Sequence, residues 1–176
     1  MVQVFLDTET TGVETGACVV ELAAILMEDG QIIDTFHQYA KPYRPMHPQA
    51  VTITGITNKF LSQFPEEKIM LQEFREWMMG VPVQQCLAYN AHFDVRIIND
   101  RMKMDHIIET NFFDDYEIID VAKIVKSAIK SGKIKTTGNS WKLENVTNYF
   151  NYKYSAHNAL EDTKAMLYVY NEVIKW

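Results

Sequence analysis

Hydrophobic and polar residues follow two different periods along this chain, which predicts both strands and helices. Near the start, apolar runs over residues 2–6, 18–27 and 32–40 have the length and composition of strands. Between the second and third runs, Asp29-Gly30 favours a tight hairpin turn. The opening of the chain therefore predicts an antiparallel meander of three strands.

The rest of the chain alternates between helical and strand patterns. Helical spacing of apolar residues indicates helices over residues 66–79, 93–103, 121–130, 142–150 and 159–176, with short helical pieces within 49–64. Further apolar runs indicate strands over residues 83–89 and 116–120. A meander followed by alternating helices and strands is typical of an α/β domain with a mixed five-stranded sheet flanked by helices. No internal repeat or linker divides the sequence, so a single domain over residues 1–176 is expected.

The composition is that of a globular chain, since 47% hydrophobic and 23% charged residues exclude a disordered protein. No apolar run reaches the roughly 18 residues of a membrane span, and the N-terminus lacks the pattern of a signal peptide, so no membrane partner is expected. Cys18 and Cys86 lie in apolar runs without metal-ligand spacing. They are expected to be buried thiols of a reducing compartment, the cytoplasm.

The formal net charge of −6 disfavours binding of nucleic acid by bulk attraction. The charge is unevenly spread, however, because residues 121–143 contain six lysines and no acidic residue. That basic stretch can attract a polyanion locally. Taken alone, a solubilising lysine face is the simpler explanation.

Two carboxylates stand near the end of the first predicted strand. Asp7 and Glu9 are separated by one residue, so they project from the same face of a strand. They repel each other unless protons, basic residues or cations lie between them, and the first lysine or arginine comes only after the third predicted strand. A divalent cation, which prefers hard oxygen ligands, is the natural candidate. Thr10-Thr11-Gly12 follows as a polar turn whose backbone N–H groups are free for a ligand.

Further polar residues stand where later helices are expected to begin. Asp94 follows the fourth predicted strand, Asp162 lies on the first turns of the final helix, and His157 precedes it in a loop. Taken singly, they are explained as first-turn acids and a surface histidine. Asp120 ends the fifth predicted strand and is expected to cap the next helix. Glu21, inside the second strand, either faces the solvent edge or supports a site.

Taken in order, three motifs resemble those of the DEDDh (DnaQ-like) 3′→5′ exonucleases, the family of the bacterial proofreading ε subunit. The motifs are Asp7-Thr8-Glu9-Thr10-Thr11-Gly12, Asn90-Ala91-His92-Phe93-Asp94 and His157-Asn158-Ala159-Leu160-Glu161-Asp162. The third is the most specific, because His157 and Asp162 have the family's spacing of five. The resemblance runs nearly end to end, and similar segments include the proline-rich crossover over residues 41–48.

The resemblance implies an RNase H-like fold and hydrolysis assisted by two divalent cations, Mg²⁺ or Mn²⁺. Two such ions about 3.5–4 Å apart neutralise phosphate charge, activate water and stabilise the departing 3′-oxygen. By analogy, Asp7 bridges both ions, Glu9 and Asp162 complete the coordination of one, and Asp94 binds mainly through water. His157 is implied to be the general base, because a neutral imidazole accepts protons near neutral pH.

The resemblance also implies that the turn after Glu9 contacts the terminal nucleotide. The candidate substrate-binding residues are Thr10, Thr11, Gly12, Ile56, Phe93, Lys133 and Lys135. Phe93 either lies against a base or sugar or packs in the core. Thr54 and Tyr89 stand where the family often has histidine, so the terminal base is expected to be held differently in detail.

The leading hypothesis is a metal-dependent 3′→5′ exonuclease that acts on single-stranded DNA and releases nucleoside 5′-monophosphates. An exoribonuclease that trims RNA 3′ ends or short RNAs is the alternative, and the Thr10-Thr11-Gly12 form of the first motif favours DNA because it looks more like proofreading members. A non-catalytic module that binds nucleic acid or a polymerase predicts loss of a ligand or the base, and all five positions are present. A stand-alone nuclease and one bound to a polymerase or other replication partner both stay open.

Overall fold

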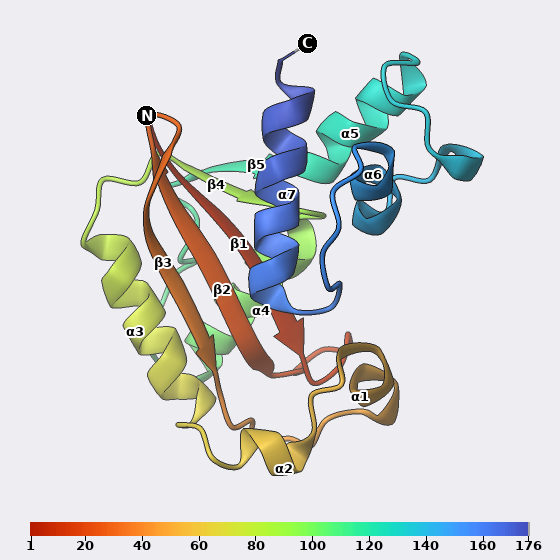
Figure 1. Cartoon of the computed structure of the whole chain (residues 1–176). Coiled ribbons are helices and arrows are strands. Elements are labelled where there is room, and N and C mark those ends of the chain that lie inside the picture. Colours follow the sequence, from red (N-terminus) through yellow and green to blue (C-terminus); the bar gives the residue numbers. More distant parts are fainter. Residues whose placement is uncertain (176) are drawn as a thin grey trace.

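A five-stranded mixed sheet forms the centre of the computed structural model, which describes residues 1–175 (Figure 1). The strands are β1 (Val2–Thr10), β2 (Val19–Glu28), β3 (Gln31–Tyr39), β4 (Gln85–Ala88) and β5 (Glu117–Asp120), in the spatial order β3-β2-β1-β4-β5. The first three strands pair antiparallel, whereas β4 and β5 run parallel to β1. The predicted α/β class and N-terminal meander are therefore confirmed.

The hairpin between β2 and β3 forms where the sequence predicts it. Asp29 and Gly30 both adopt positive φ, 49° and 83°, as a two-residue turn of this type requires. The fourth strand is shorter than predicted and begins at Gln85, because residues 81–83 form a turn in which the N–H of Val83 bonds to the carbonyl of Val81.

Helices cover both faces of the sheet. They are α1 (Pro48–Thr54), α2 (Asn58–Leu61), α3 (Glu67–Met79), α4 (His92–Met104), α5 (Val121–Lys130), α6 (Leu143–Tyr149) and α7 (Ala159–Val173), with a 3₁₀ turn over Thr137–Asn139. In Figure 1, α7 crosses one face with α5 and α6 beside it, and α4 lies behind the sheet. The predicted final helix ends earlier, at Val173, and its expected last residue, Trp176, lies outside the described residues.

The alternation of side chains along β1 assigns its residues to two cores. Val4 and Leu6 belong to the core shared with α3 and α4, whereas Phe5 belongs to the core shared with α5 and α7. Phe5 packs edge-on against Tyr170 of α7, with 5.3 Å between ring centroids. Since every second residue of a strand points the same way, the residues two and four positions after Phe5 also face α7.

The ends of the parallel strands position the rest of the site. Ala88 and Asp120 end β4 and β5 at the same edge of the sheet as the end of β1, and α4 and α5 start from this edge. The Asp120 carboxylate accepts hydrogen bonds from the N–H groups of Ala122, 3.0 Å, and Asn90, 3.1 Å. The predicted capping role of Asp120 is confirmed, and it also fixes the turn that leads into α4.

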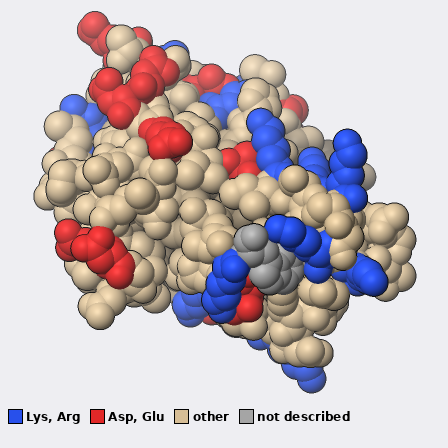
Figure 2. Space-filling view, turned by 90° about the horizontal axis from the view of Figure 1, so that it is seen from above, with Lys and Arg blue, Asp and Glu red and all other residues tan. Residues whose placement is uncertain are grey.

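Charge is separated on the surface as the sequence indicates. Figure 2 views the molecule from the end where α7 finishes, and Lys and Arg side chains gather on the side of α5 and the loop that follows it. Cys18 and Cys86 are buried thiols, as predicted, and burial raises the pKa of Cys18 to about 11. Within residues 1–175, no helix combines the length and apolar character needed to cross a membrane.

Candidate active site

Three carboxylates converge where α7 begins over the end of β1. Asp7 and Glu9 project from the α7 face of β1, and Asp162 lies on the first turn of α7. One oxygen from each of these side chains lies within 4.8 Å of the others. Asp7 and Asp162 are 155 positions apart in the chain, and the structure brings them together. All three residues were predicted as metal ligands.

The electrostatics of this cluster fit a cation. Burial, together with the negative charges of Asp94 and Asp162, raises the pKa of Asp7 well above its usual value. Burial, followed by the charges of Asp162 and Glu21, raises the pKa of Glu9 to about 8. Carboxylates in this environment are stabilised in their ionised form by an adjacent positive ion. The donor set consists entirely of hard oxygen atoms, which suits Mg²⁺ or Mn²⁺.

Asp94 lies beside the cluster but is held differently. Its side chain is 3% exposed, and its Oδ1 accepts hydrogen bonds from the N–H of Thr8 at 3.1 Å and the hydroxyl of Thr8 at 2.7 Å. Burial raises the pKa of Asp94 to about 7, although these hydrogen bonds oppose the rise. Because Thr8 stands between Asp7 and Glu9, these bonds tie the start of α4 to the first motif.

His157 lies on the loop that leads into α7. Its backbone has a positive φ of 66°, and the residue is exposed. The next residue, Asn158, caps α7 by accepting a 3.1 Å hydrogen bond from the N–H of Glu161, and its own N–H donates to Oδ2 of Asp162, also at 3.1 Å. His157 and Asp162 are therefore positioned by the same cap.

A buried network supports this cap from the sheet. Glu21 is 0% exposed, so the prediction that it could face the solvent edge is wrong, and the alternative that it supports the site stays a prediction. Its Oε1 accepts a 2.8 Å hydrogen bond from Nδ2 of Asn158 and lies 2.8 Å from Nε2 of His37. The Asn158 amide also donates to the hydroxyl of Tyr39 at 3.1 Å. Sequence reasoning missed Asn158 and His37, although the charge inside a strand signalled that buried partners exist.

Tyr154 is a third residue that sequence reasoning missed. Its hydroxyl is buried, and burial together with the charge of Asp162 raises the pKa of Tyr154. Burial also raises the pKa of Asp162, and the hydrogen bond that its side chain accepts from the N–H of Asn158 acts in the opposite direction. The tyrosine stands in an irregular segment before the third motif, and no sequence pattern marks it.

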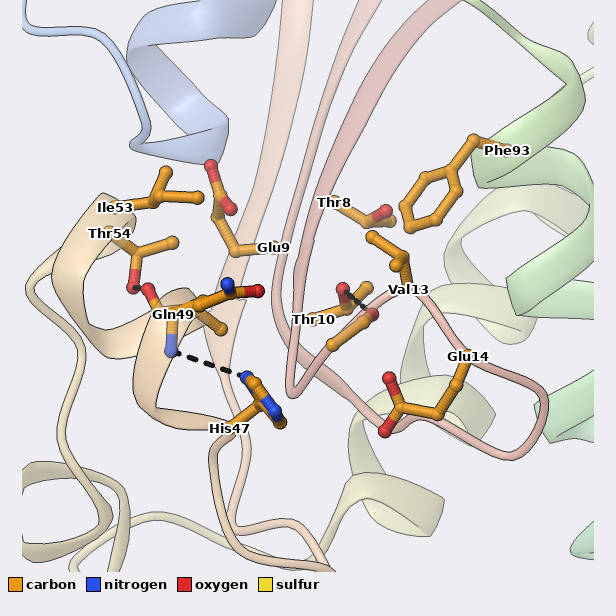
Figure 3. Close-up of a pocket in the computed structure, with 12 residues that line it drawn as sticks. Thr8, Glu9, Thr10, Val13, Glu14, His47, Gln49, Ile53, Thr54 and Phe93 are labelled. Carbon is orange, nitrogen blue, oxygen red and sulfur yellow. Dashed lines mark hydrogen bonds between the residues drawn. The ribbon is translucent and has the colours of Figure 1, made fainter.

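A cavity of about 370 Å³ opens next to Glu9 (Figure 3). It is lined by Thr8, Glu9, Thr10, Gly12, Val13, Glu14, His47, Gln49, Ala50, Ile53, Thr54 and Phe93. In Figure 3, residues of α1 and the turn after β1 face one another across the cavity, with Phe93 of α4 at its edge. A 2.6 Å hydrogen bond from the Thr10 hydroxyl to the carbonyl of Gly12 closes the turn.

Some predicted substrate contacts line this cavity and others do not. Thr10, Gly12 and Phe93 line it. Thr11 is buried, and its hydroxyl accepts a 2.9 Å hydrogen bond from the N–H of Cys18. In the turn after β1, Thr10 and Gly12 therefore face the cavity, whereas the side chain of Thr11 lies in the protein interior.

Other predicted contacts lie elsewhere in the structure. Ile56 packs in a small core cluster with Val20, Met46 and Leu61, and Ile53 lines the cavity instead. Lys133 and Lys135 belong to the loop beyond α5, away from α1 in Figure 1, and neither lines the cavity. The structure does not bring these two lysines together with the carboxylates.

Comparison with known proteins identifies the family of this chain. A family model described as exonuclease, of the RNase T type, matches residues 4–170, and the chain therefore belongs to that exonuclease family. PolC-type DNA polymerase III of Bacillus cereus is 30% identical over 173 residues, which cover 98% of this chain and 11% of that protein. The ε subunit of DNA polymerase III of Haemophilus influenzae is 35% identical over 119 residues, 60% of this chain and 45% of that protein. The resemblance to DnaQ-like proofreading exonucleases is confirmed.

Solved structures agree on the fold. E. coli exonuclease I in complex with a dT13 oligonucleotide superposes with a TM-score of 0.87 at 23% identity, covering 98% of this chain and 40% of that one. Cell-death related nuclease 4 gives a TM-score of 0.81 at 19% identity, covering 99% and 64% of the two chains. The predicted RNase H-like exonuclease fold is confirmed. The chain spans about a tenth of the PolC-type relatives and less than half of the ε subunits that it matches.

Proposed function

We propose that this chain is a metal-dependent 3′→5′ exonuclease that releases nucleoside 5′-monophosphates from single-stranded DNA. The observation that supports this most strongly is the convergence of Asp7, Glu9 and Asp162 beside a cavity of about 370 Å³. A cavity of this size is in the range of small-ligand sites and accommodates one terminal nucleotide. The names of the relatives, which are DNA polymerases and a nuclease crystallised with dT13, support DNA as the substrate.

The carboxylates would hold two divalent cations, with Asp7, Glu9 and Asp162 as direct ligands and Asp94 as a partner through water. Bound Mg²⁺ or Mn²⁺ supplies neutralisation of the scissile phosphate and activation of water. Four carboxylates balance two such ions in formal charge. Thr8 holds Asp94 in place through its backbone N–H and its hydroxyl.

His157 accepts the proton of the attacking water at its imidazole ring. Its place next to the Asn158 cap puts the ring on the loop that also orients Asp162. Exposure of the residue lets the ring exchange its proton with solvent after each turnover.

The terminal nucleotide lies in the cavity between α1 and the turn after β1. Ile53 and Phe93 offer apolar surface for the base and sugar, and Thr10 and Gly12 form the polar wall. A double-stranded end does not present its terminal nucleotide singly, so this cavity favours an unpaired 3′ end.

An exoribonuclease is the second candidate, because the matching family model takes its name from an RNase. The names of the relatives support a replication polymerase as the partner. Because these relatives are bacterial DNA polymerases and their subunits, they also support a cytoplasmic location. The test of substrate class compares DNA and RNA 12-mers of one sequence, each with a free or a phosphorylated 3′ end. We expect the free-ended DNA to be degraded fastest. A faster rate on RNA would assign the exoribonuclease function.

A further inference from the structure

An exposed tryptophan lies on the lysine-rich side of the molecule. Trp141 precedes α6 and is 39% exposed. The Nζ of Lys126, on α5, lies 3.6 Å from the centroid of the Trp141 ring. Together they line a cavity of about 310 Å³ whose remaining lining residues are Ile129, Lys130 and Asn139. None of the described residues that line this cavity is acidic.

The surrounding surface favours a polyanion. Residues 121–143 contain six lysines and no acidic residue in a chain of net charge −6. Lys and Arg side chains gather on this side in Figure 2, while acidic side chains gather mainly on the opposite side. Such separation creates a local positive potential that the net charge does not reveal. A tryptophan face beside lysines is the arrangement that binds single-stranded nucleic acid through stacking and phosphate contacts.

The backbone at Trp141 is tied to the catalytic elements. The hydroxyl of Tyr89 donates a hydrogen bond to the carbonyl oxygen of Trp141. Tyr89 immediately follows β4 and precedes the turn into α4, which contains Asp94. On the other side of Trp141, Glu144 of α6 is close enough to Tyr154 for its charge to raise the pKa of that hydroxyl, and Tyr154 lies beside Asp162. The cavity therefore lies next to the elements that contain the second and third motifs.

We propose that Trp141, Lys126 and Lys130 form a subsite for upstream nucleotides of the strand whose 3′ end occupies the cavity beside Glu9. This inference rests on the proposed exonuclease function. A base stacks on the indole of Trp141, and the two ammonium groups contact the neighbouring phosphates. The Nζ of Lys126 covers one face of the ring at 3.6 Å from its centroid, so a base that stacks on this face takes the place of the ammonium group, which then turns to a neighbouring phosphate. The subsite therefore affects how tightly a long strand binds and leaves the chemistry at the 3′ end unchanged.

The first test separates long from short substrates. We expect Trp141→Ala to raise the KM for dT12 about tenfold without changing kcat. The same variant leaves the KM for the p-nitrophenyl ester of thymidine 5′-monophosphate unchanged, because that substrate occupies the catalytic cavity alone. Trp141→Phe retains most of the affinity for dT12. Equal KM values of Trp141→Ala and the unmodified protein for dT12 would overturn the proposal.

The second test does not require catalysis. Of the three tryptophans, Trp77 and Trp176 are replaced by phenylalanine, so that fluorescence reports Trp141 alone. We expect dT12 to quench this fluorescence in EDTA, and the binding constant from the quenching to fall as salt is added. Lys126→Gln and Lys130→Gln should each reduce the slope of log K against log salt concentration by about one. The matched controls Lys59→Gln and Lys68→Gln, on α2 and α3, leave the quenching unchanged.

The two tests distinguish the subsite from the function on which it rests. Absence of hydrolysis on every substrate, with quenching by dT12 intact, would contradict the exonuclease function and leave the strand-binding site standing. Hydrolysis of both substrates without quenching would overturn the subsite alone. Equal quenching by a poly-glutamate peptide of matched charge would also overturn it, since this would assign the surface to an acidic protein.

Discussion

Nδ2 of Asn158 donates a 2.8 Å hydrogen bond to Oε1 of Glu21, a residue 137 positions earlier in the chain. The bond joins the N-cap of α7 to β2, where Glu21 lies opposite Glu9 in the register of the sheet. Asn158 also caps the helix and donates its N–H to Asp162. Through its side chain and its backbone N–H, Asn158 therefore couples the fully buried Glu21 to the residues that we propose as metal ligand and general base.

This coupling predicts a catalytic defect without unfolding. Asn158→Ser keeps a capping hydroxyl but loses the amide that reaches Glu21, so the free energy of unfolding falls by only about 1 kcal/mol. We expect kcat to fall about 10- to 100-fold and the apparent affinity for Mg²⁺ to fall with it, because such supporting contacts orient metal ligands. Steady-state kinetics at several Mg²⁺ concentrations measure both. Wild-type values for Asn158→Ser would contradict the coupling, and Asn171→Ser, an exposed change near the other end of α7, is the control.

Burial of Glu9, together with repulsion within the carboxylate cluster, predicts a pH-dependent stability. The pKa of Glu9 is raised from 4.5 to about 8 in the folded state, so folding favours its protonated form. The stabilisation from this proton is complete below pH 4.5 and is lost as pH rises toward 8. We expect the Tm of the metal-free protein to fall across this window and Mg²⁺ to restore it at pH 8.

Glu9→Gln isolates the contribution of this one group. Without the buried charge, the metal-free variant should be more stable than the unmodified protein at pH 8 by about 1–2 kcal/mol. The added stability from Mg²⁺ should largely disappear. Calorimetry of both metal-free proteins at pH 5 and pH 8 gives the comparison. If the Tm of Glu9→Gln differed from that of the unmodified protein by the same amount at both pH values, the predicted cost of the buried Glu9 charge would be refuted.

The Thr8 hydroxyl predicts how firmly Asp94 is held. Thr8→Val removes the 2.7 Å hydrogen bond to Asp94 but preserves side-chain shape and the backbone N–H bond. A hydrogen bond to a charged group is worth about 1.5–3 kcal/mol, so we expect a stability loss of that order and a kcat about tenfold lower. Thr110→Val, at an exposed bend between α4 and β5, should change neither quantity. Unaltered kcat in Thr8→Val would show that Asp94 needs no such support.

Two isoleucines near α1 form a matched pair that separates binding from packing. Ile53 is exposed in the cavity, whereas Ile56 is buried in the cluster of Val20, Met46 and Leu61. Ile53→Ala should raise the KM for single-stranded DNA about fivefold with little loss of stability, since it removes roughly one apolar contact. Ile56→Ala should instead lower the free energy of unfolding by about 2–4 kcal/mol. The reverse pattern in kinetics and denaturant unfolding would place the nucleotide elsewhere.

The sequence predicted the parts of the fold that local patterns determine. The apolar runs over residues 2–6, 18–27 and 32–40 and the Asp29-Gly30 turn specify the meander, and the two-residue period of a strand points Asp7 and Glu9 to one face. The spacing of His157 and Asp162 identifies the third motif. This spacing is local, because His157 immediately precedes the cap residue Asn158 and Asp162 lies on the first turn after it. These features depend on residues that are close together in the sequence, so they can be recognised from a single sequence without a structure.

The remainder depends on contacts between distant segments. Nothing near Glu21 in the sequence indicates that its partner is Asn158, because the contact exists only once α7 packs on β2. The choice of Ile53 rather than Ile56 for the cavity wall follows from how the short α1 turns back after Gly55, whose φ is 73°. The lysine stretch was recognised, but its pairing with the exposed Trp141 appears only in three dimensions.

The most direct test of the central claim follows a 5′-labelled single-stranded DNA 20-mer in Mg²⁺ by gel electrophoresis. The proposed function predicts a ladder that shortens from the 3′ end with release of nucleoside 5′-monophosphates and no reaction in EDTA. It also predicts a rate at least about 10³-fold lower in Asp162→Asn, since metal-ligand carboxylates enable the chemistry. Glu161→Gln, the adjacent acid that pairs with Lys164, should cut at nearly the unmodified rate. A folded protein that leaves the DNA intact, or an Asp162→Asn variant as active as Glu161→Gln, would contradict the account.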